Sequence, residues 1–517
     1  MDWFIFLFIF FFLLISIHGL LHLRNHLINP SSKKFPPGPT GLPILGNLVQ
    51  LGDRPHESLT QLATIHGPLM TVRLGFVTTI VASSVNTVKE ILQTHDQAFM
   101  GRSIPDAATA ETGHEFSITW LSGGPRWRNL RKLCNTQIFT TQRLDSNSMH
   151  TLRLQIMEDM VKSVVEEIEG GGGGGGGEAS VNVGRIVFGT SLNLLSNTFF
   201  SFDMIDDQKS KSVDEIKEII WRIMDLAGKP NVADYFPMLR PFDPQGIRRE
   251  IKVCYDRLHS LLEDVIHGRL RHRASGSVSS GDFLDVLLDY SHEHGDDFSL
   301  SDIKLLLSAL FIGGTDTTTT TLEWAMAELL HNPTALSVAE RELSETIGGG
   351  RSIKESDLRS LPYMKAALKE SMRLHPTVPF LLPHRALMDV DLYDFHIPKH
   401  TQLLINAYAI ARDPAYWVNP NRFLPERFLG SEIDFRGNDL CFIPFGAGRR
   451  MCPGLPLAER MMEMMLATLL NRFHWKLPRG MTPEEMDMKD RLGISLHKAT
   501  PLIAVPVVNV DGERDKN

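Results

Sequence analysis

Cys452 lies in the ten-residue stretch 445–454, FGAGRRMCPG, directly ahead of an apolar run at 455–470 that predicts a helix. Three glycines of this stretch lack a Cβ, so the backbone can fold tightly beneath a flat group. The N-terminus of the predicted helix would direct free N–H groups at the sulfur and lower the pKa of the thiol. The pattern favours a metal-binding thiolate, although a lone cysteine is more often a buried thiol.

A second unusual stretch occupies the centre of a helix predicted over 305–330. The centre, from Gly313 to Thr321, is GGTDTTTTT, and glycine or threonine costs about 0.5–1 kcal/mol relative to alanine in a helix interior. We expect a distorted helix that passes close to another group, with Thr317 bonding back to the carbonyl of Gly313. A low-complexity threonine patch explains the same residues equally well.

Further candidates are charged or aromatic side chains at helical or loop positions. Glu370 and Arg373 share one helix face at i, i+3, and Arg427 follows in the segment PERF. By itself such a pair is a common surface feature. Trp127 and Arg131 also share one helix face, at i, i+4, which by itself describes an amphipathic surface helix.

Length and composition indicate one large domain of ordinary globular character. The chain has 517 residues, 43% hydrophobic and 22% charged, and no Pro/Ser-rich linker or charge run divides its middle. The net charge of −8 argues against nucleic acid as a partner. Its four scattered cysteines include no Cys-x-x-Cys pair, which argues against zinc, iron–sulfur clusters and a disulfide framework and suits a reducing compartment.

The N-terminus predicts a single-pass membrane anchor over residues 1–23. Trp3–Leu23 carries no formal charge and would span about 31 Å as a helix, enough for a bilayer core. A cleaved signal peptide would need a basic start, whereas Asp2 comes first and the basic residues follow the run. The positive-inside rule then places the remaining chain in the cytosol. Residues 24–47, basic and then proline-rich, are expected to form either a spacer or a hinge at the membrane.

Two other segments have simple interpretations. The alternating run at 69–81 predicts a β-hairpin. The eight glycines at 170–177 contain Gly-x-Gly-x-x-Gly trivially, but no apolar strand precedes them, so we expect a surface connection and no dinucleotide site.

Taken in order, these motifs resemble those of the cytochrome P450 haem-thiolate monooxygenases over essentially the whole chain. The resemblance implies a mainly α fold with a small β subdomain over 48–517, and haem b as cofactor with Cys452 as its axial iron ligand. It gives Asp316 and Thr317 roles in proton delivery, and makes Glu370, Arg373 and Arg427 a structural network beneath the haem loop. It also assigns to the haem site the residues Phe445, Gly446, Arg102, Trp127, Arg131, His384 and Arg450, the last five as donors to the propionates.

Longer segments such as LPYMKAALKESMRLHP resemble the plant microsomal subgroup that contains geraniol hydroxylases. This resemblance implies hydroxylation of a small lipophilic metabolite, a terpenoid such as a monoterpenol or diterpene first and an alkaloid or phenolic aromatic second. It further implies O2 as a co-substrate and a location at the endoplasmic reticulum membrane. Electrons would come from a partner NADPH-dependent flavoprotein reductase, so NADPH and flavins would take part only indirectly. Arg128, Lys132 and Arg449, expected near the cysteine side, could attract the acidic surface of that reductase.

Two other functions stay open at this point. One is a haem-thiolate isomerase or dehydratase that needs no reductase, against which the intact Asp316–Thr317 pair argues. The other is a non-catalytic membrane haem protein or lipid binder. The segments expected around the pocket, 104–116, 309–317, 378–382 and 494–496, are mixed in character but carry many apolar residues, as ordinary core also does.

Overall fold

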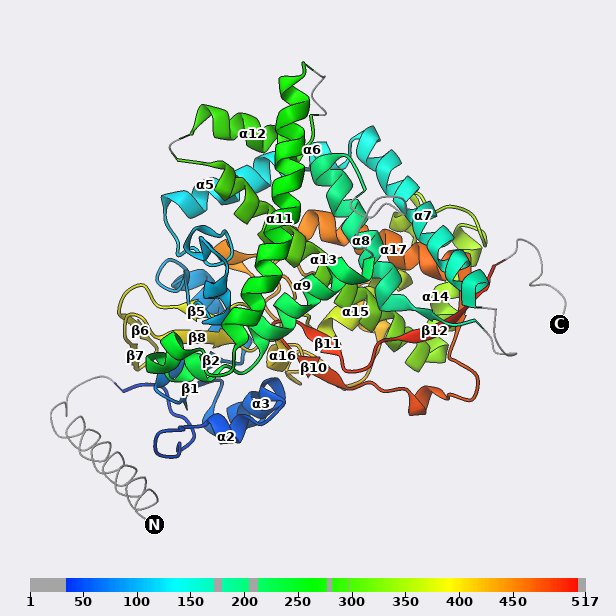
Figure 1. Ribbon diagram of the computed structural model, residues 1–517. Helices are drawn as coiled ribbons and strands as arrows, with labels where there is room; N and C mark the ends of the chain where they lie inside the picture. Colours follow the sequence, from blue (N-terminus) through cyan, green and yellow to red (C-terminus); the bar gives the residue numbers. More distant parts are fainter. Residues whose placement is uncertain (1–33, 172–178, 204–212, 277–280, 296, 510–517) are drawn as a thin grey trace, which may run out of the picture.

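A computed structural model describes residues 34–171, 179–203, 213–276, 281–295 and 297–509 (Figure 1). The predicted anchor and most of the glycine run lie outside these ranges; the first two glycines of the run end a long helix. Within the described ranges, no helix combines the length and the apolar character that crossing a bilayer requires.

Helices make up most of the described chain, and the prediction of a mainly α fold is confirmed. The α-helices are α2 (Leu48–Leu51), α3 (Pro55–His66), α4 (Val85–Lys89), α5 (Pro125–Leu133), α6 (Thr141–Leu144), α7 (Asn147–Gly171), α8 (Val183–Phe200), α9 (Val213–Gly228), α10 (Val232–Tyr235), α11 (Ile247–Ala274), α12 (Phe283–Glu293), α13 (Leu300–His331), α14 (Pro333–Thr346), α15 (Pro362–Leu374), α16 (Ala407–Ile410) and α17 (Leu455–Arg472).

In the part of the chain that the structure describes, short strands form four small sheets. The strands are β1 (Leu69–Leu74), β2 (Val77–Ala82), β3 (Gly101–Arg102), β4 (Val181–Asn182), β5 (His384–Arg385), β6 (Val390–Leu392), β7 (Phe395–Ile397), β8 (Gln402–Ile405), β9 (Phe473–Lys476), β10 (Asp490–Leu492), β11 (Leu496–Lys498) and β12 (Ile503–Val508). The largest sheet has the order β1-β2-β8-β5-β3, and β1 pairs with β2 as the predicted hairpin.

The long helix α13 forms the centre of the molecule and contacts α8, α11, α15 and α17 (Figure 1). It is helical through its glycine- and threonine-rich centre, where threonine hydroxyls donate to carbonyls four residues earlier. Its flanks are strongly apolar, and Phe311, Leu322 and Trp324 are almost fully buried. Since it crosses the core, one of its faces can be left open to a cavity without exposing the helix to solvent.

The proline-rich segment packs along β1. The carbonyl of Pro37 accepts a hydrogen bond from the Thr71 N–H (2.8 Å), and a Cβ on Gly38 would lie 1.8 Å from the Thr71 carbonyl oxygen. Asn47 closes the segment, because its Oδ1 accepts from the Arg73 N–H at 2.7 Å. The described part of the predicted hinge is therefore attached to the sheet, which a free spacer would not be.

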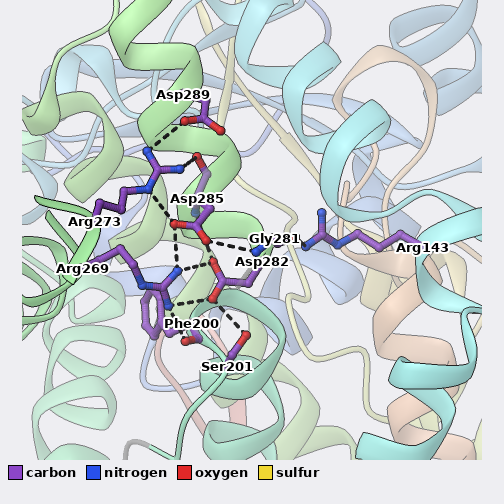
Figure 2. A network of polar contacts seen from close by, with 9 residues as sticks. All are labelled: Arg143, Phe200, Ser201, Arg269, Arg273, Gly281, Asp282, Asp285 and Asp289. Atoms are coloured by element: carbon purple, nitrogen blue, oxygen red, sulfur yellow. Dashed lines mark hydrogen bonds and ion pairs between the residues drawn. The ribbon is translucent and has the colours of Figure 1, made fainter. Parts of the chain in front are cut away.

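A buried ionic network fixes the ends of α8, α11 and α12 (Figure 2). The guanidinium of Arg269 donates to both carboxylate oxygens of Asp282 (2.8 and 2.7 Å) and to the carbonyl of Phe200. Asp282 also caps α12 by accepting from the Asp285 N–H. Arg273 extends the network by donating to Asp285 at 2.9 Å. Both Arg269 and Asp282 are largely buried, so each depends on the other.

We predict that Asp282→Ala lowers the free energy of unfolding by about 2 kcal/mol or more. The change removes the bidentate partner of the buried Arg269, which keeps its ion pair with Asp285 at 3.1 Å, and it removes the cap of α12. Urea unfolding of the purified protein measures this loss. Asp289→Ala is the matched control: Asp289 pairs with Arg273 at 2.8 Å but is 65% exposed, so we expect a loss below about 1 kcal/mol. Equal losses for the two variants would contradict the prediction.

Candidate active site

An internal cavity of about 350 Å³ brings together residues that are far apart in the sequence. Cys452 and the loop before it form one wall, and the centre of α13 forms another. The sequence-predicted residues that line it are Arg102, Trp127, Arg131, Thr317, His384, Phe445, Gly446, Arg450 and Cys452. Asp316, Glu370, Arg373 and Arg427 are predicted site residues that lie elsewhere.

The loop that carries Cys452 depends on glycines. Gly446 and Gly448 have φ values of 73° and 66°, in the left-handed region that side chains disfavour. A Cβ on Gly448 would lie 2.2 Å from the Leu92 carbonyl oxygen, so the loop can approach this carbonyl only with glycine there. The loop is closed by the Cys452 N–H, which donates to the carbonyl of Phe445 at 2.9 Å. These constraints hold the sulfur of Cys452 at the cavity.

The Cys452 side chain is exposed to the cavity yet enclosed by the body of the protein. Burial raises the pKa of the thiol above its ordinary value, while the N–H groups of Gly454 and Leu455 and the nearby Arg131 oppose this rise. The predicted donors at the N-terminus of α17 are therefore present, but the predicted net lowering of the pKa is wrong, because desolvation outweighs them. A bound metal ion would reverse the balance, since it deprotonates a coordinating thiol.

Three arginines and a histidine cluster at one side of the cavity. Arg102 and His384 are cross-strand neighbours on β3 and β5, and Arg131 and Trp127 come from one face of α5. Arg450 lies with its guanidinium 4.4 Å from the centre of the Trp127 ring and donates to the Met100 carbonyl at 2.9 Å. The fold thus gathers side chains from four segments that no local pattern connects.

These arginines lack an acidic partner within the described residues. The Arg102 Nε is buried and has no hydrogen-bond partner, although Nη1 donates to the Leu382 carbonyl at 2.7 Å. Burial, with repulsion from a neighbouring arginine, lowers the pKa of Arg102 to about 9 and that of Arg450 to about 10. Burial also lowers the pKa of His384 to about 3, so His384 is neutral. The cluster suits an anion that would relieve this mutual repulsion.

Thr317 and Asp316 point to different surroundings. Thr317 lines the cavity, and its hydroxyl donates to the carbonyl of Gly313 at 2.5 Å, which is the predicted bond. Asp316 is buried on the other side, where its Oδ2 accepts from the Ser495 hydroxyl at 2.7 Å and its Oδ1 lies 3.6 Å from His497 Nε2. The structure therefore places one member of the predicted pair at the cavity and the other against the β10–β11 turn.

Glu370, Arg373 and Arg427 form one buried network away from the cavity. Both oxygens of Glu370 accept from Arg373 (2.7 and 2.8 Å), and Oε1 also accepts from Arg427 at 3.0 Å. Arg373 further donates to the carbonyls of Ala411 and Pro420. Since Glu370 and Arg373 are completely buried, the network ties α15 to the segment that leads to the Cys452 loop.

The sequence interpretation missed much of the cavity wall. The missed residues are apolar or aromatic and come from α8, α9, α11 and the loop before α5: Trp120, Leu195, Phe199, Ile223, Met224, Ala227 and Tyr255. No local signal separates them from ordinary core. Of the predicted segment 494–496, Ile494 lines the cavity, whereas Leu496 is fully buried.

The chain matches the family model described as "Cytochrome P450" over residues 36–505. It is a cytochrome P450. Members of this family are haem b enzymes, and the cavity fits that cofactor on its own chemistry: a thiol at one wall, glycines that allow close approach, and unpaired cations suited to two propionates. The family resemblance drawn from the motifs is thereby confirmed.

Named relatives place this P450 among plant monooxygenases. The chain is 45% identical to a geraniol 8-hydroxylase of Swertia mussotii, over 94% of this chain and 96% of the relative. It is 46% identical to a geraniol 8-hydroxylase of Catharanthus roseus (92% and 94% covered). It is 44% identical to a drimenol monooxygenase of Persicaria hydropiper (96% of each chain). The chain is accordingly a P450 monooxygenase.

We predict that Gly448→Ala prevents normal haem incorporation, because its Cβ would collide with the Leu92 carbonyl and displace the Cys452 loop. The ratio of haem to protein in the purified variant measures this effect. Gly430→Ala is a matched control, since Gly430 has the same φ of 66° but no atom within 4 Å of the added Cβ. It carries the same backbone strain, of order 1 kcal/mol, without the collision. A normal haem content in Gly448→Ala would contradict the prediction.

Proposed function

We propose that this P450 hydroxylates a small lipophilic plant metabolite, a terpenoid first and an alkaloid or phenolic aromatic second. The supporting observation is the cavity itself, in which a thiol and a threonine hydroxyl face a mainly apolar space of about 350 Å³. The relatives whose names specify geraniol and drimenol favour a terpenoid substrate. We infer that O2 is the oxidant and that an NADPH-dependent reductase supplies the electrons.

Residue roles in this proposal follow from position. Cys452 would hold the haem iron through its sulfur, and Phe445 and Gly446, which line the same cavity, would contact the haem. The propionates would be held by the donors of the cationic cluster: Arg102, Trp127, Arg131, His384 and Arg450. Haem bound through a thiolate supplies the activation of O2. Glu370, Arg373 and Arg427 would brace the loop without taking part in the chemistry.

Thr317 would hold a proton at the cavity. Its hydroxyl can accept a hydrogen bond from water while it donates to the Gly313 carbonyl, so it can order a water molecule in a mainly apolar cavity. Asp316 would serve as proton source only from a side-chain rotamer that leaves Ser495, because its present contacts point away from the cavity. The threonine, on this proposal, acts directly, and the aspartate acts after a local rearrangement.

Access and membrane attachment are part of the same proposal. A second cavity of about 600 Å³ shares Trp120, Ala227, Leu381, Leu382 and Ile494 with the first, which suits a route for the substrate. Several large apolar side chains in the same chain segments as its lining residues are exposed. They are Leu42, Leu45, Val49, Phe76, Met238 and Phe242.

We propose that residues 1–23 anchor the chain in the endoplasmic reticulum membrane, that 24–47 form the hinge, and that 48–517 form a cytosolic catalytic domain.

Coexpression with a plant P450 reductase tests this function. Terpene alcohols, diterpene olefins and aromatic amines would be supplied, and oxygenated products that require NADPH and reductase are expected. Products formed without reductase would instead support the isomerase or dehydratase alternative. Absence of a thiolate-type Soret band in the reduced carbon monoxide complex would contradict the proposed haem ligation.

We predict that Thr317→Ala retains bound haem but forms at least about tenfold less product per NADPH consumed, because a positioned proton donor typically contributes 10²–10⁴-fold. Product yield, peroxide release and NADPH consumption are measured together. Thr319→Ala is a useful control, since its hydroxyl makes the same i−4 bond, to Thr315, away from the cavity. Unchanged coupling in Thr317→Ala would remove the proposed proton role.

We predict that the double change Arg128→Glu and Lys132→Glu raises the KM for reductase about tenfold at low salt, with less effect at high salt. Both residues are exposed on α5, and neither has an ionic partner within the described residues, so they are available to an acidic protein surface. Arg449 is less available because it is paired with Asp96 at 2.5 Å. Turnover supported by a peroxide in place of reductase is the control and should be unchanged.

A further inference from the structure

A buried carboxylate lies in the wall of the cavity and has a different set of partners from the cationic cluster. Glu111 lines the cavity, and its side chain is only 4% exposed. Its Oε1 accepts from the hydroxyl of Ser308 on α13 (2.9 Å) and lies 3.2 Å from His259 Nε2 on α11. Its Oε2, in contrast, has no hydrogen-bond partner within the described residues. One acceptor oxygen is therefore unused in a nearly dry site.

A phenol lies beside this carboxylate in the same wall. Tyr255 lines the cavity and is 7% exposed, and its ring centre lies 5.9 Å from that of His259. Burial and the neighbouring Glu111 raise the pKa of Tyr255 well above its ordinary value, so the phenol stays protonated and able to donate. No described residue accepts a hydrogen bond from its hydroxyl. The wall thus offers one acceptor and one donor, both without partners.

The surroundings make this pair selective. The nearby wall is apolar and includes Phe199, Ile223 and Met224. A ligand without polar atoms would cover the Oε2 of Glu111 and the hydroxyl of Tyr255 and leave both atoms without a hydrogen bond, which costs about 1–3 kcal/mol for each. A hydroxyl can donate to Glu111 and accept from Tyr255 at once, which an ether or a hydrocarbon cannot do.

We propose that Glu111 and Tyr255 bind the hydroxyl group of a lipophilic alcohol and so determine which substrates this enzyme accepts. This inference rests on the proposed monooxygenase function and specifies its substrate class. The contact with Ser308 also gives the orientation, because Ser308 precedes Thr317 by nine residues, about 13 Å along the axis of α13. An extended alcohol held at Glu111 therefore presents the end of its carbon chain remote from the hydroxyl to the Thr317 side.

The test compares ligands that differ only at this group, bound to the full-length holoprotein. Geraniol, geranyl methyl ether and the corresponding hydrocarbon, 2,6-dimethyl-2,6-octadiene, are titrated by the shift of the Soret band. Wild type should bind geraniol about tenfold or more tightly than the ether, as expected for a hydrogen bond to a charged acceptor. Glu111→Met should remove most of this preference for geraniol over the ether, and Glu111→Gln, which keeps an acceptor oxygen, should retain part of it.

A second variant keeps the proposal testable if Glu111→Met does not fold. Tyr255→Phe should lower the affinity for the ether about threefold relative to the affinity for the hydrocarbon, because the ether oxygen loses the Tyr255 hydroxyl as a hydrogen-bond donor. Glu115→Gln is the matched control in the same loop. Glu115 is 56% exposed, pairs with His114 and does not line the cavity, so all three affinities should be unchanged. Substrate turnover should also shift from the remote end of geraniol to mixed positions in Glu111→Met.

Three results would overturn the proposal. The first is equal affinity of wild type for geraniol and its methyl ether. The second is loss of affinity for all three probes by the same factor in the variants, which would indicate only a structural role for Glu111 and Tyr255. The third is a strong preference of wild type for geranylamine over geraniol, which would make the site one for a cation. A missing thiolate Soret band in wild type would count against the proposed function, not against this site.

Discussion

Burying several positive charges around one cavity is unfavourable unless an anion joins them, and this constraint shapes the part of the molecule around the Cys452 loop. Arg102, Arg131 and Arg450 reach the cavity from a strand, a helix and the Cys452 loop, and their pKa values are lowered by burial. No single element could hold them so close. The fold supplies the required rigidity, and haem propionates would supply the missing charge, so haem binding and stability of this region are expected to be coupled.

Near this cluster, the residues that support the Cys452 loop are different from the residues that line the cavity. In the Glu370–Arg373–Arg427 network the first two residues are completely buried, and the network makes contacts to backbone carbonyls as well as to its own members. Such a network is costly to disrupt because each buried charge depends on the others. It lies outside the cavity, which suits a bracing role. The glycines of the Cys452 loop then allow the supported backbone to approach its neighbours more closely than any side chain would permit.

The part of the cavity wall that does not carry the cationic cluster differs in polarity. It is assembled from α8, α9, α11 and the loop before α5, and it is mainly apolar with one carboxylate and one phenol. Apolar walls discriminate weakly between lipophilic molecules, whereas an unpaired buried polar group discriminates strongly against a ligand that leaves it unpaired. In this enzyme, oxygen chemistry is thus expected to depend on the Cys452 side, and substrate selectivity on the wall formed by α8, α9, α11 and the loop before α5.

The sequence alone determined the chemical class of this protein and most of its helical organisation. FGAGRRMCPG, GGTDTT and the ExxR and PERF segments are local patterns, and the properties that matter in them, a thiol, flexible backbone and short-range pairing, are local as well. The hairpin at 69–81 and helix α13 were predictable for the same reason, because hydrophobic period and turn chemistry act over a few residues. The direction of the Cys452 pKa was not predictable, since desolvation depends on everything packed around the thiol.

Tertiary structure alone decided which side chains meet. Asp316 and Thr317 are adjacent in sequence, but successive side chains of a helix point in different directions. Asp316 therefore contacts Ser495, whereas Thr317 lines the cavity. Glu111, Ser308 and His259 are separated by up to 197 residues and still share one carboxylate oxygen. No periodicity in the chain marks Glu111 or Tyr255, because their importance comes from burial and missing partners. Those properties exist only once the distant segments have packed together.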